Sequence, residues 1–415
     1  MTVPPISGTA DDIFARLFLT GDFVEDPYPD YEELRLLSRA HRLGGGALVV
    51  TAYGDCAAVL RDPRFGNDME AIGQAKGGAS WRDHASLAML SRMMLIANPP
   101  RHGSLHRRVG TEFTPARIRA IEPVIARAAG ELFAGLCERG GGDFISMYAD
   151  VLPLLTIHAV LGIPDSHRIE LRRQTLAFNA LFERGLTAPH IAAADDAVDE
   201  ITLYLTDLIA YRRGQPADDL VSALVAAANR GAVAEDELVP LVFQVYNAAY
   251  QTTMSLLGNG LRQLLLHPAE LARLRGDPLL LSPACDELAR IDPPVQSTGR
   301  HAFVDLDLDG IPVRAGDMVI AIIAAANRDP ARFHDPERLD VGRVGPTGLS
   351  YGYGPHYCLG AALAAEQLRA TLRLLTASGV LIEANGPMVR LASANMRGFA
   401  HLPVTIHHRA KRVDR

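Results

Sequence analysis

Apolar positions recur with a helical period along most of the chain. Residues 117–140 and 193–214 carry apolar side chains at i, i+3 and i+4, with charged side chains on the opposite face. This spacing predicts amphipathic helices. Residues 235–268 are apolar on nearly every side, begin with acidic residues and end at His267-Pro268. That pattern predicts a helix running through the middle of the fold.

A few shorter segments have the composition of strands. Residues 47–62, "ALVVTAYGDCAAVLRD", predict a β-branched strand followed by a helix, and residues 305–329 predict a strand pair around an Asp309-Gly310 turn. The chain has no internal repeat and no low-complexity linker. We therefore expect one mainly α domain over residues 1–415, with a smaller β region.

Composition narrows the classes of protein to consider. The chain has 415 residues, of which 48% are hydrophobic, so it can bury a sizeable core. A formal charge of −7 with interspersed signs argues against nucleic acid and anionic membranes as bulk partners. No apolar run approaches the roughly eighteen residues of a membrane span, and residues 1–14 lack the layout of a signal peptide. We expect a cytoplasmic protein.

The four cysteines stand far apart and form no C-x-x-C pair, which disfavours structural zinc and disulfides. Cys56, Cys137 and Cys285 lie in helical patterns and are most simply small core residues. Cys358 follows the glycine-rich stretch "YGYGPHY", at the mouth of a helix predicted over residues 359–375. Unpaired backbone N–H groups and the helix dipole favour a thiolate there, so Cys358 is a candidate ligand or nucleophile.

Polar residues interrupt the predicted central helix. Gln244, Asn247 and Gln251 share one of its faces, and each buried amide left unpaired would cost about 1–3 kcal/mol. Thr252 can instead bond back to the preceding turn. Two interpretations stay open for the amides: they line a cavity or cofactor, or they link neighbouring helices.

Glu287 and Arg290 are three residues apart and therefore meet on one helix face. Asp292-Pro293-Pro294 then ends the helix. An exposed pair of this kind contributes only a few tenths of a kcal/mol, so the pair carries no meaning in isolation.

The motifs gain meaning from their order. Glu-x-x-Arg followed by Pro-Pro, then "ANRDPARFHDPERL", then a glycine-framed His-x-Cys-x-Gly resemble the cytochrome P-450 family, specifically its soluble bacterial members. The resemblance covers nearly the whole chain, and its cysteine motif is highly specific. It implies a mainly α fold with a smaller β region. It also implies haem b, iron protoporphyrin IX, buried between the central helix and the helix after the cysteine.

The resemblance assigns roles to individual residues. Cys358 would give its thiolate to the haem iron, a strong donor that favours O–O cleavage. Glu287, Arg290 and Arg338 would form a structural triad behind the cysteine loop. The further cofactor contacts that it implies are His102, His106, Arg107, Arg300, Tyr351, Gly352, His356 and Gly360. Two of these depart from the family pattern, since phenylalanine is usual at Tyr351 and arginine is common at His106.

The oxygen-handling helix departs further from the family pattern. Family members show Ala-Gly, any residue, an acid and Thr, where this chain has "AAYQT" from Ala248 to Thr252. Ala249 adds a methyl group, and Gln251 replaces a proton-exchanging group by an amide that only orients waters. The resemblance makes Ala248, Gln251 and Thr252 the catalytic candidates. The side chains expected to face a polar substrate are Gln244, Asn247, Val295 and Thr298.

These features predict a haem-thiolate monooxygenase of secondary metabolism. It would use dioxygen to hydroxylate or epoxidise a small to medium organic substrate.

The chain has no Rossmann fingerprint or ferredoxin cysteine spacing, so a ferredoxin-type donor and its reductase would supply electrons. Two interpretations stay open for Arg107, Arg108, Arg369 and Arg373: a basic patch that docks the donor, or scattered surface arginines. Ala249 and Gln251 keep an atypical outcome open, such as oxidative coupling, desaturation or peroxide-driven oxidation. A non-catalytic haem or ligand-binding module is the other alternative.

Overall fold

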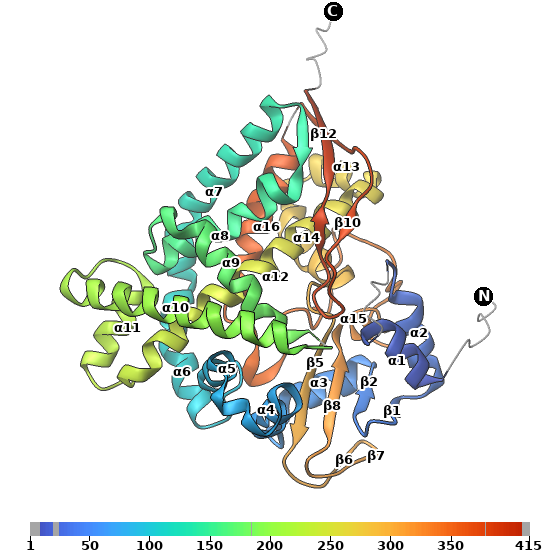
Figure 1. Cartoon of the computed structure of the whole chain (residues 1–415). Coiled ribbons are helices and arrows are strands. Elements are labelled where there is room, and N and C mark those ends of the chain that lie inside the picture. The colour runs from blue at the N-terminus through green and yellow to red at the C-terminus, as the bar shows by residue number, and fades with distance from the viewer. Residues whose placement is uncertain (1–8, 20–24, 184, 378, 409–415) are drawn as a thin grey trace, which may run out of the picture.

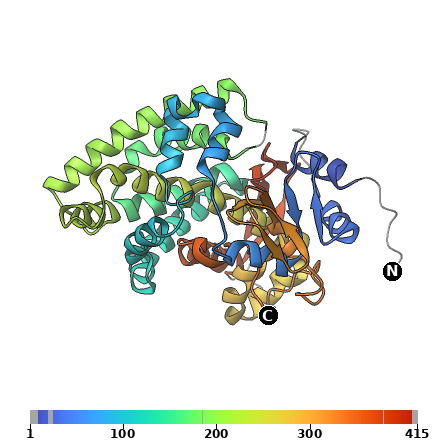
Figure 2. The ribbon, with the colours of Figure 1, turned by 90° about the horizontal axis from the view of Figure 1, so that it is seen from below.

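Helices dominate the fold, and the strands gather in smaller sheets (Figure 1). The computed structural model describes residues 9–19, 25–183, 185–377 and 379–408. Seen from below, most helices lie on one side, and the orange strands lie with the blue N-terminal helices on the other (Figure 2). Across the described residues, no helix combines the length and apolarity that a membrane span requires.

The α-helices are α1 (Ala10–Phe18), α2 (Tyr28–Leu37), α3 (Tyr53–Arg61), α4 (Met69–Gly77), α5 (Ala85–Arg92), α6 (Arg101–Gly110), α7 (Pro115–Glu138), α8 (Val151–Leu161), α9 (Arg168–Asn179), α10 (Ala188–Gly214), α11 (Leu220–Asn229), α12 (Leu238–Leu266), α13 (Pro268–Gly276), α14 (Leu281–Ile291), α15 (Ile323–Ala326) and α16 (Ala361–Thr376). The strands are β1 (Ala40–Arg42), β2 (Leu48–Val50), β3 (Phe65–Gly66), β4 (Gly141–Asp143), β5 (Ser297–Ala302), β6 (Leu306–Leu308), β7 (Ile311–Val313), β8 (Met318–Ile322), β9 (Val380–Ala384), β10 (Val389–Arg390), β11 (Phe399–His401) and β12 (Pro403–His408). The predicted helices α7, α10 and α12 are confirmed, as is the mainly α class.

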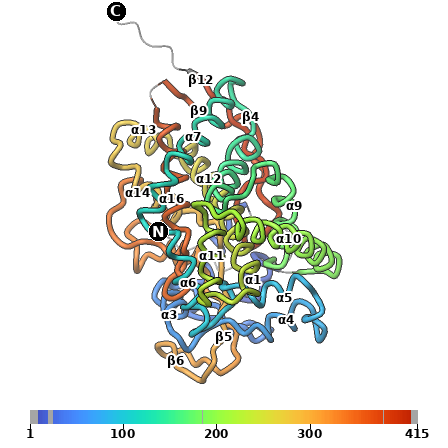
Figure 3. Tube along the Cα trace, turned by 90° about the vertical axis from the view of Figure 1, so that its left-hand side faces the viewer, coloured from blue at the N-terminus to red at the C-terminus, as the bar shows by residue number. Residues whose placement is uncertain are grey.

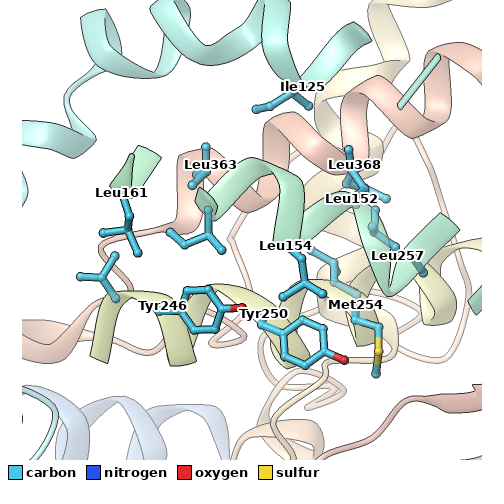
Figure 4. Packing of buried hydrophobic residues seen from close by; sticks show 14 of the residues in the cluster. Ile125, Leu152, Leu154, Leu161, Tyr246, Tyr250, Met254, Leu257, Leu363 and Leu368 are labelled. Atoms are coloured by element: carbon cyan, nitrogen blue, oxygen red, sulfur yellow. The ribbon is translucent and has the colours of Figure 1, made fainter. Parts of the chain in front are cut away.

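Helix α12 forms the centre of the largest hydrophobic cluster, as its all-round apolar sequence predicts. Tyr246, Tyr250 and Met254 lie along one side of it, facing Leu154 of α8, and Leu363 comes from the neighbouring α16 (Figure 4). In the side view α12 lies between α16 and the pair α9 and α10 (Figure 3). One side of α12 is therefore part of the hydrophobic core, and its remaining face is available for other contacts.

A five-stranded sheet of order β1-β2-β8-β5-β3 forms the second part, with β2 and β8 parallel. Val50 and Ala321 pack against α3 on one face, and Val49 and Ile322 join α1 on the other. Successive side chains of a strand point to opposite faces, so covering both faces makes these strands apolar throughout. The predicted hairpin is also present, because β6 and β7 pair around Asp309 and Gly310, both at positive φ.

The Glu287–Arg290 pair is buried and not a surface pair. Arg290 Nε donates to Glu287 Oε2 at 2.7 Å, and the two side chains are 2% and 1% exposed. Arg343, and not the predicted Arg338, supplies the third side chain, with its Nε 3.0 Å from both carboxylate oxygens. Among the bonds of the described residues, Arg338 reaches this cluster through its backbone carbonyl, which accepts from Arg290 and Arg343. Arg343 also donates to backbone carbonyls between His334 and Arg338, which folds this segment back and brings its guanidinium to Glu287.

The same cluster supports the segment that leads into the cysteine loop. Arg290 Nη1 donates to the Asn327 carbonyl at 2.8 Å, and Asn327 Oδ1 accepts from Leu349 N at 2.6 Å. Ser350 Oγ donates to the Ala289 carbonyl at 2.6 Å. These bonds fix the chain directly before Tyr351, so the buried pair positions the loop that carries Cys358.

Replacing Glu287 by alanine is expected to destabilise the fold strongly. Removal leaves Arg290 and Arg343 with an uncompensated buried charge, which costs about 3–5 kcal/mol. Chemical unfolding monitored by circular dichroism measures the change, and little folded protein should be recovered.

The matched control is Glu170→Ala. Glu170 and Arg173 have the same i,i+3 spacing, but their side chains are 55% and 59% exposed. This change should leave the free energy of unfolding almost unaltered. If Glu287→Ala behaves like Glu170→Ala, the buried carboxylate does not support the fold.

Candidate active site

The cysteine loop is a closed turn at the N-terminus of α16. Cys358 N donates to the Tyr351 carbonyl at 2.8 Å, which closes the loop three residues before α16 begins. Gly352 and Gly354 have φ values of 74° and 71°, in the region that favours glycine. A Cβ on Gly354 would also lie 2.7 Å from the Leu60 carbonyl oxygen of α3. Gly354 therefore serves the packing of the loop on α3.

Cys358 keeps exposed surface although many protein atoms surround its thiol. Its surface is uncovered, yet burial raises the pKa of the thiol, and the backbone N–H of Gly360 lowers it by a smaller amount. The helix terminus therefore does not by itself produce the thiolate expected from the sequence, because burial outweighs it. A bound metal cation deprotonates a coordinating thiol outright. A thiol that is desolvated yet belongs to an exposed residue is suited to that role.

Three histidines and an arginine gather near this loop. His102 and His106 come from α6, and their ring centroids are 5.4 Å apart. His356, two residues before Cys358, lies 3.9 Å from His102 between centroids. Arg300 on β5 influences both His102 and His356 electrostatically. Residues far apart in the sequence thus form one basic cluster.

No carboxylate of the described residues influences the pKa of His102, Arg300 or His356. Burial, together with the positive charges of its neighbours, lowers the pKa of His102 to about 4 and that of His356 to about 3. Burial lowers the pKa of Arg300 to about 10, and its guanidinium donates only to Gly299 O and Thr298 Oγ1 among the described residues. His106 Nε2 is buried without a hydrogen-bond partner among the described residues. The cluster fits an anion, such as the two propionates of haem.

One stripe in the middle of α12 is uncovered, whereas most of the helix is buried. Ala248 is exposed, and Ala249, Gln251 and Thr252 are half-buried. Thr252 Oγ1 donates to the Ala248 carbonyl at 2.7 Å, which is the bond to the preceding turn that the sequence allows. The catalytic candidates therefore lie on one uncovered stripe of the central helix.

The predicted substrate residues differ in their contacts. Gln244 Oε1 accepts from Leu95 N at 3.0 Å, and Gln251 Oε1 accepts from Asn179 Nδ2 at 2.9 Å. These two amides link α12 to neighbouring segments, whereas Asn247 Oδ1 is buried without a partner in the described chain. No sequence pattern announced Leu95 or Asn179 as partners, because each contact spans a long stretch of chain.

Val295 and Thr298 are half-buried on the segment that enters β5 and on β5 itself. Val295 forms an isolated bridge with Met396, and Thr298 Oγ1 accepts from Arg300 Nη1 at 3.2 Å. Thr298 is therefore tied to the basic cluster, and Val295 to the C-terminal segment.

The predicted basic patch divides into two parts. Arg107 and Arg108 are exposed on α6. On α16, Arg369 Nη1 donates to Glu366, and Arg373 Nη1 donates to Glu366 Oε1 at 3.1 Å. Glu366 therefore offsets the positive charge of α16, and the positive charge available to a partner lies mainly on α6.

The comparisons with known proteins agree with this geometry. The profile of the family described as Cytochrome P450 matches residues 278–376. The cytochrome P450 monooxygenase PikC of Streptomyces venezuelae is 34% identical over 92% of both chains. Vitamin D(3) 25-hydroxylase of Pseudonocardia autotrophica is 32% identical over 94% of this chain and 96% of its own. The crystal structure of CalO2 superimposes with a TM-score of 0.85 at 31% identity, covering 93% of this chain and 97% of its own.

An uncovered cysteine at the mouth of α16, an uncompensated basic cluster beside it and whole-length identity above 30% lead to one conclusion. The chain belongs to the cytochrome P450 family, whose members bind haem b.

Proposed function

We propose that this protein is a haem-thiolate monooxygenase that hydroxylates or epoxidises a small to medium organic molecule of secondary metabolism. The observation that carries the proposal is the uncovered thiol of Cys358 beside a basic cluster without a counter-anion. Relatives named as a monooxygenase and a hydroxylase support the reaction class. We propose further that residues 1–415 form one domain, because α12 contacts both α10 and α16, the helix that follows the cysteine loop.

Each part of the site has a task in this proposal. Cys358 would hold the iron, and His102, His106, Arg300 and His356 would bind the two propionates by charge-assisted hydrogen bonds. When bound, haem supplies the activation of dioxygen and the transfer of one oxygen atom to the substrate. The uncovered stripe of α12 borders the reacting molecules, and the Thr252 hydroxyl can pass a proton only by giving up its bond to the Ala248 carbonyl.

Gln251 raises the question of where protons come from. Its amide accepts a hydrogen bond from Asn179, and a neutral amide does not exchange protons as a carboxylate does. We propose that ordered water or the substrate delivers protons to the Thr252 side of α12, and that Gln251 holds α9 in place. Because Gln251 is hydrogen-bonded to Asn179 and does not exchange protons, an atypical oxidation is the second candidate function.

We propose that a ferredoxin-type protein delivers the electrons and docks on α6. Arg107 and Arg108 are exposed there, close to the cysteine loop, since Gly110 of the same helix packs near Leu359. An acidic partner would be attracted by this charge and held a short distance from Cys358.

Reduction under carbon monoxide tests the ligation. The wild type should give the strongly red-shifted Soret band of thiolate-ligated iron, because the sulfur donates more electron density than histidine does. Cys358→Ala should lack that band, and Cys137→Ala, which changes a cysteine of α7, should retain it. A carbonyl spectrum of the histidine type in the wild type contradicts the proposal.

Gln251→Glu tests the proton source. The new carboxylate would keep the bond from Asn179 but would be partly desolvated without a cationic partner, so product formed per electron donor consumed should fall. Thr252→Ala should lower the same ratio if its hydroxyl takes part. A higher ratio in Gln251→Glu would show that an acid at this position completes the relay.

Charge reversal tests the docking surface. The double change Arg107→Glu and Arg108→Glu should raise the KM for an acidic ferredoxin about tenfold at low salt, and the effect should shrink as salt screens the charges. Arg373→Glu is the control, since Glu366 already offsets that arginine. Equal effects of the two changes would place the partner on α16 as much as on α6.

A further inference from the structure

The face of α12 that carries three amides also contacts the segment at Leu95 and the end of α9. Gln244, Asn247 and Gln251 follow at spacings of three and four residues and so share this face. The distance from the first to the last is about 10 Å along the helix axis. Gln244 holds the segment at Leu95, and Gln251 holds the end of α9 at Asn179.

Asn247 lies between these two contacts, and its side-chain oxygen makes no comparable hydrogen bond within the described residues. Its side chain is 9% exposed, and its Oδ1 is buried without a hydrogen-bond donor in the described part of the chain. Buried amide oxygens are paired in the large majority of cases, because an unpaired one costs free energy. An exception in the middle of a site therefore calls for a partner that is not part of the protein.

The surroundings of Asn247 indicate where that partner would lie. One turn before it, the ring of Phe243 contacts Phe178 of α9, with 4.9 Å between centroids. One turn after it, Gln251 binds Asn179, also on α9. The next residue, Ala248, is exposed. Asn247 is thus bracketed by two contacts with α9 and adjoins the uncovered stripe.

The facing helix supplies a second polar atom without a partner. Thr175 precedes Phe178 by three residues and Asn179 by four, so it shares their side of α9. Its side chain is 0% exposed, and no donor or acceptor in the described chain pairs with its hydroxyl. An oxygen acceptor on α12 and a hydroxyl on α9 together suit a group that both donates and accepts, which is the property of an alcohol.

We propose that Asn247 Oδ1 accepts a hydrogen bond from a hydroxyl group of the substrate and makes the enzyme select hydroxyl-bearing molecules over their ethers. The inference rests on the proposed function and adds a substrate class to it. A site built to hydrogen-bond a substrate hydroxyl rejects the analogue that lacks it, because its own buried polar atoms then stay unpaired.

The stability of the ligand-free holoprotein gives the first test. Asn247→Leu removes the unpaired oxygen at similar volume, so the Tm should rise by about 2 °C. Gln244→Leu and Gln251→Leu are matched controls and should lower the Tm, because they leave Leu95 N and Asn179 Nδ2 without acceptors. A Tm of Asn247→Leu at or below that of the wild type means that Asn247 already has a partner, such as a fixed water, and overturns the proposal.

Binding gives the second test. The probes are octan-1-ol, decan-1-ol and dodecan-1-ol, each against the linear methyl ether with the same number of heavy atoms, titrated by the change in the haem spectrum. The wild type should bind the best alcohol about tenfold more tightly than its ether. Asn247→Leu should lose this preference, and Gln244→Leu should keep it.

Each remaining outcome decides the matter. Equal affinities in the wild type, tighter binding of the ethers, no binding of any alcohol, or an unchanged preference in Asn247→Leu overturns the proposal. The carbon monoxide spectrum of the wild type distinguishes a failure of the proposed function from a failure of this inference. Loss of the thiolate-type band contradicts the proposed function, whereas a normal band without an alcohol preference contradicts this inference alone.

Discussion

The buried carboxylate of Glu287 is the constraint on which the site depends. It binds Arg290 on its own helix and Arg343 on the segment that leads to the cysteine loop, and Arg290 in turn holds the carbonyl of Asn327. Asn327 then binds Leu349 N, two residues before the loop begins at Tyr351. Removing one partner of a buried ion pair leaves an uncompensated charge, so the paired arrangement of this cluster is strongly favoured. The loop is closed by its own bond from Cys358 N to the Tyr351 carbonyl, and the buried cluster fixes where that closed loop begins.

Around this rigid support the protein leaves polar groups unsatisfied. The pKa values of His102, His356 and Arg300 are all lowered by burial, and the first two are lowered further by neighbouring positive charge. Cys358 is exposed, yet desolvation by the surrounding protein raises the pKa of its thiol. Each of these features opposes folding of the chain alone, and each is relieved by a ligand that brings two carboxylates and a metal. The stability of the fold and the binding of haem are therefore coupled.

Helix α12 shows how one element serves both core and chemistry. Tyr246 and Tyr250 anchor one side of it in the hydrophobic cluster, while Ala248 and Thr252 lie on the uncovered stripe. Between these sides, Gln244 accepts a hydrogen bond from Leu95 N, and Gln251 accepts one from Asn179 of α9. The packed side fixes the position of the helix, which lets the other side carry side chains chosen for function and not for stability.

The sequence by itself determined the elements and the loop. Helical periodicity predicted α7, α10 and α12, the Asp309-Gly310 turn predicted the hairpin, and the glycine-framed cysteine identified the ligand candidate, because all of these are local properties of the chain. Tertiary structure alone decided that Arg343 and not Arg338 binds Glu287. It also decided that Gln251 binds Asn179 while Asn247 Oδ1 has no partner among the described residues. These outcomes depend on side chains that are dozens of residues apart in sequence. Which of two nearby arginines reaches a buried carboxylate is set by the path of the packed chain, and no local period encodes that path.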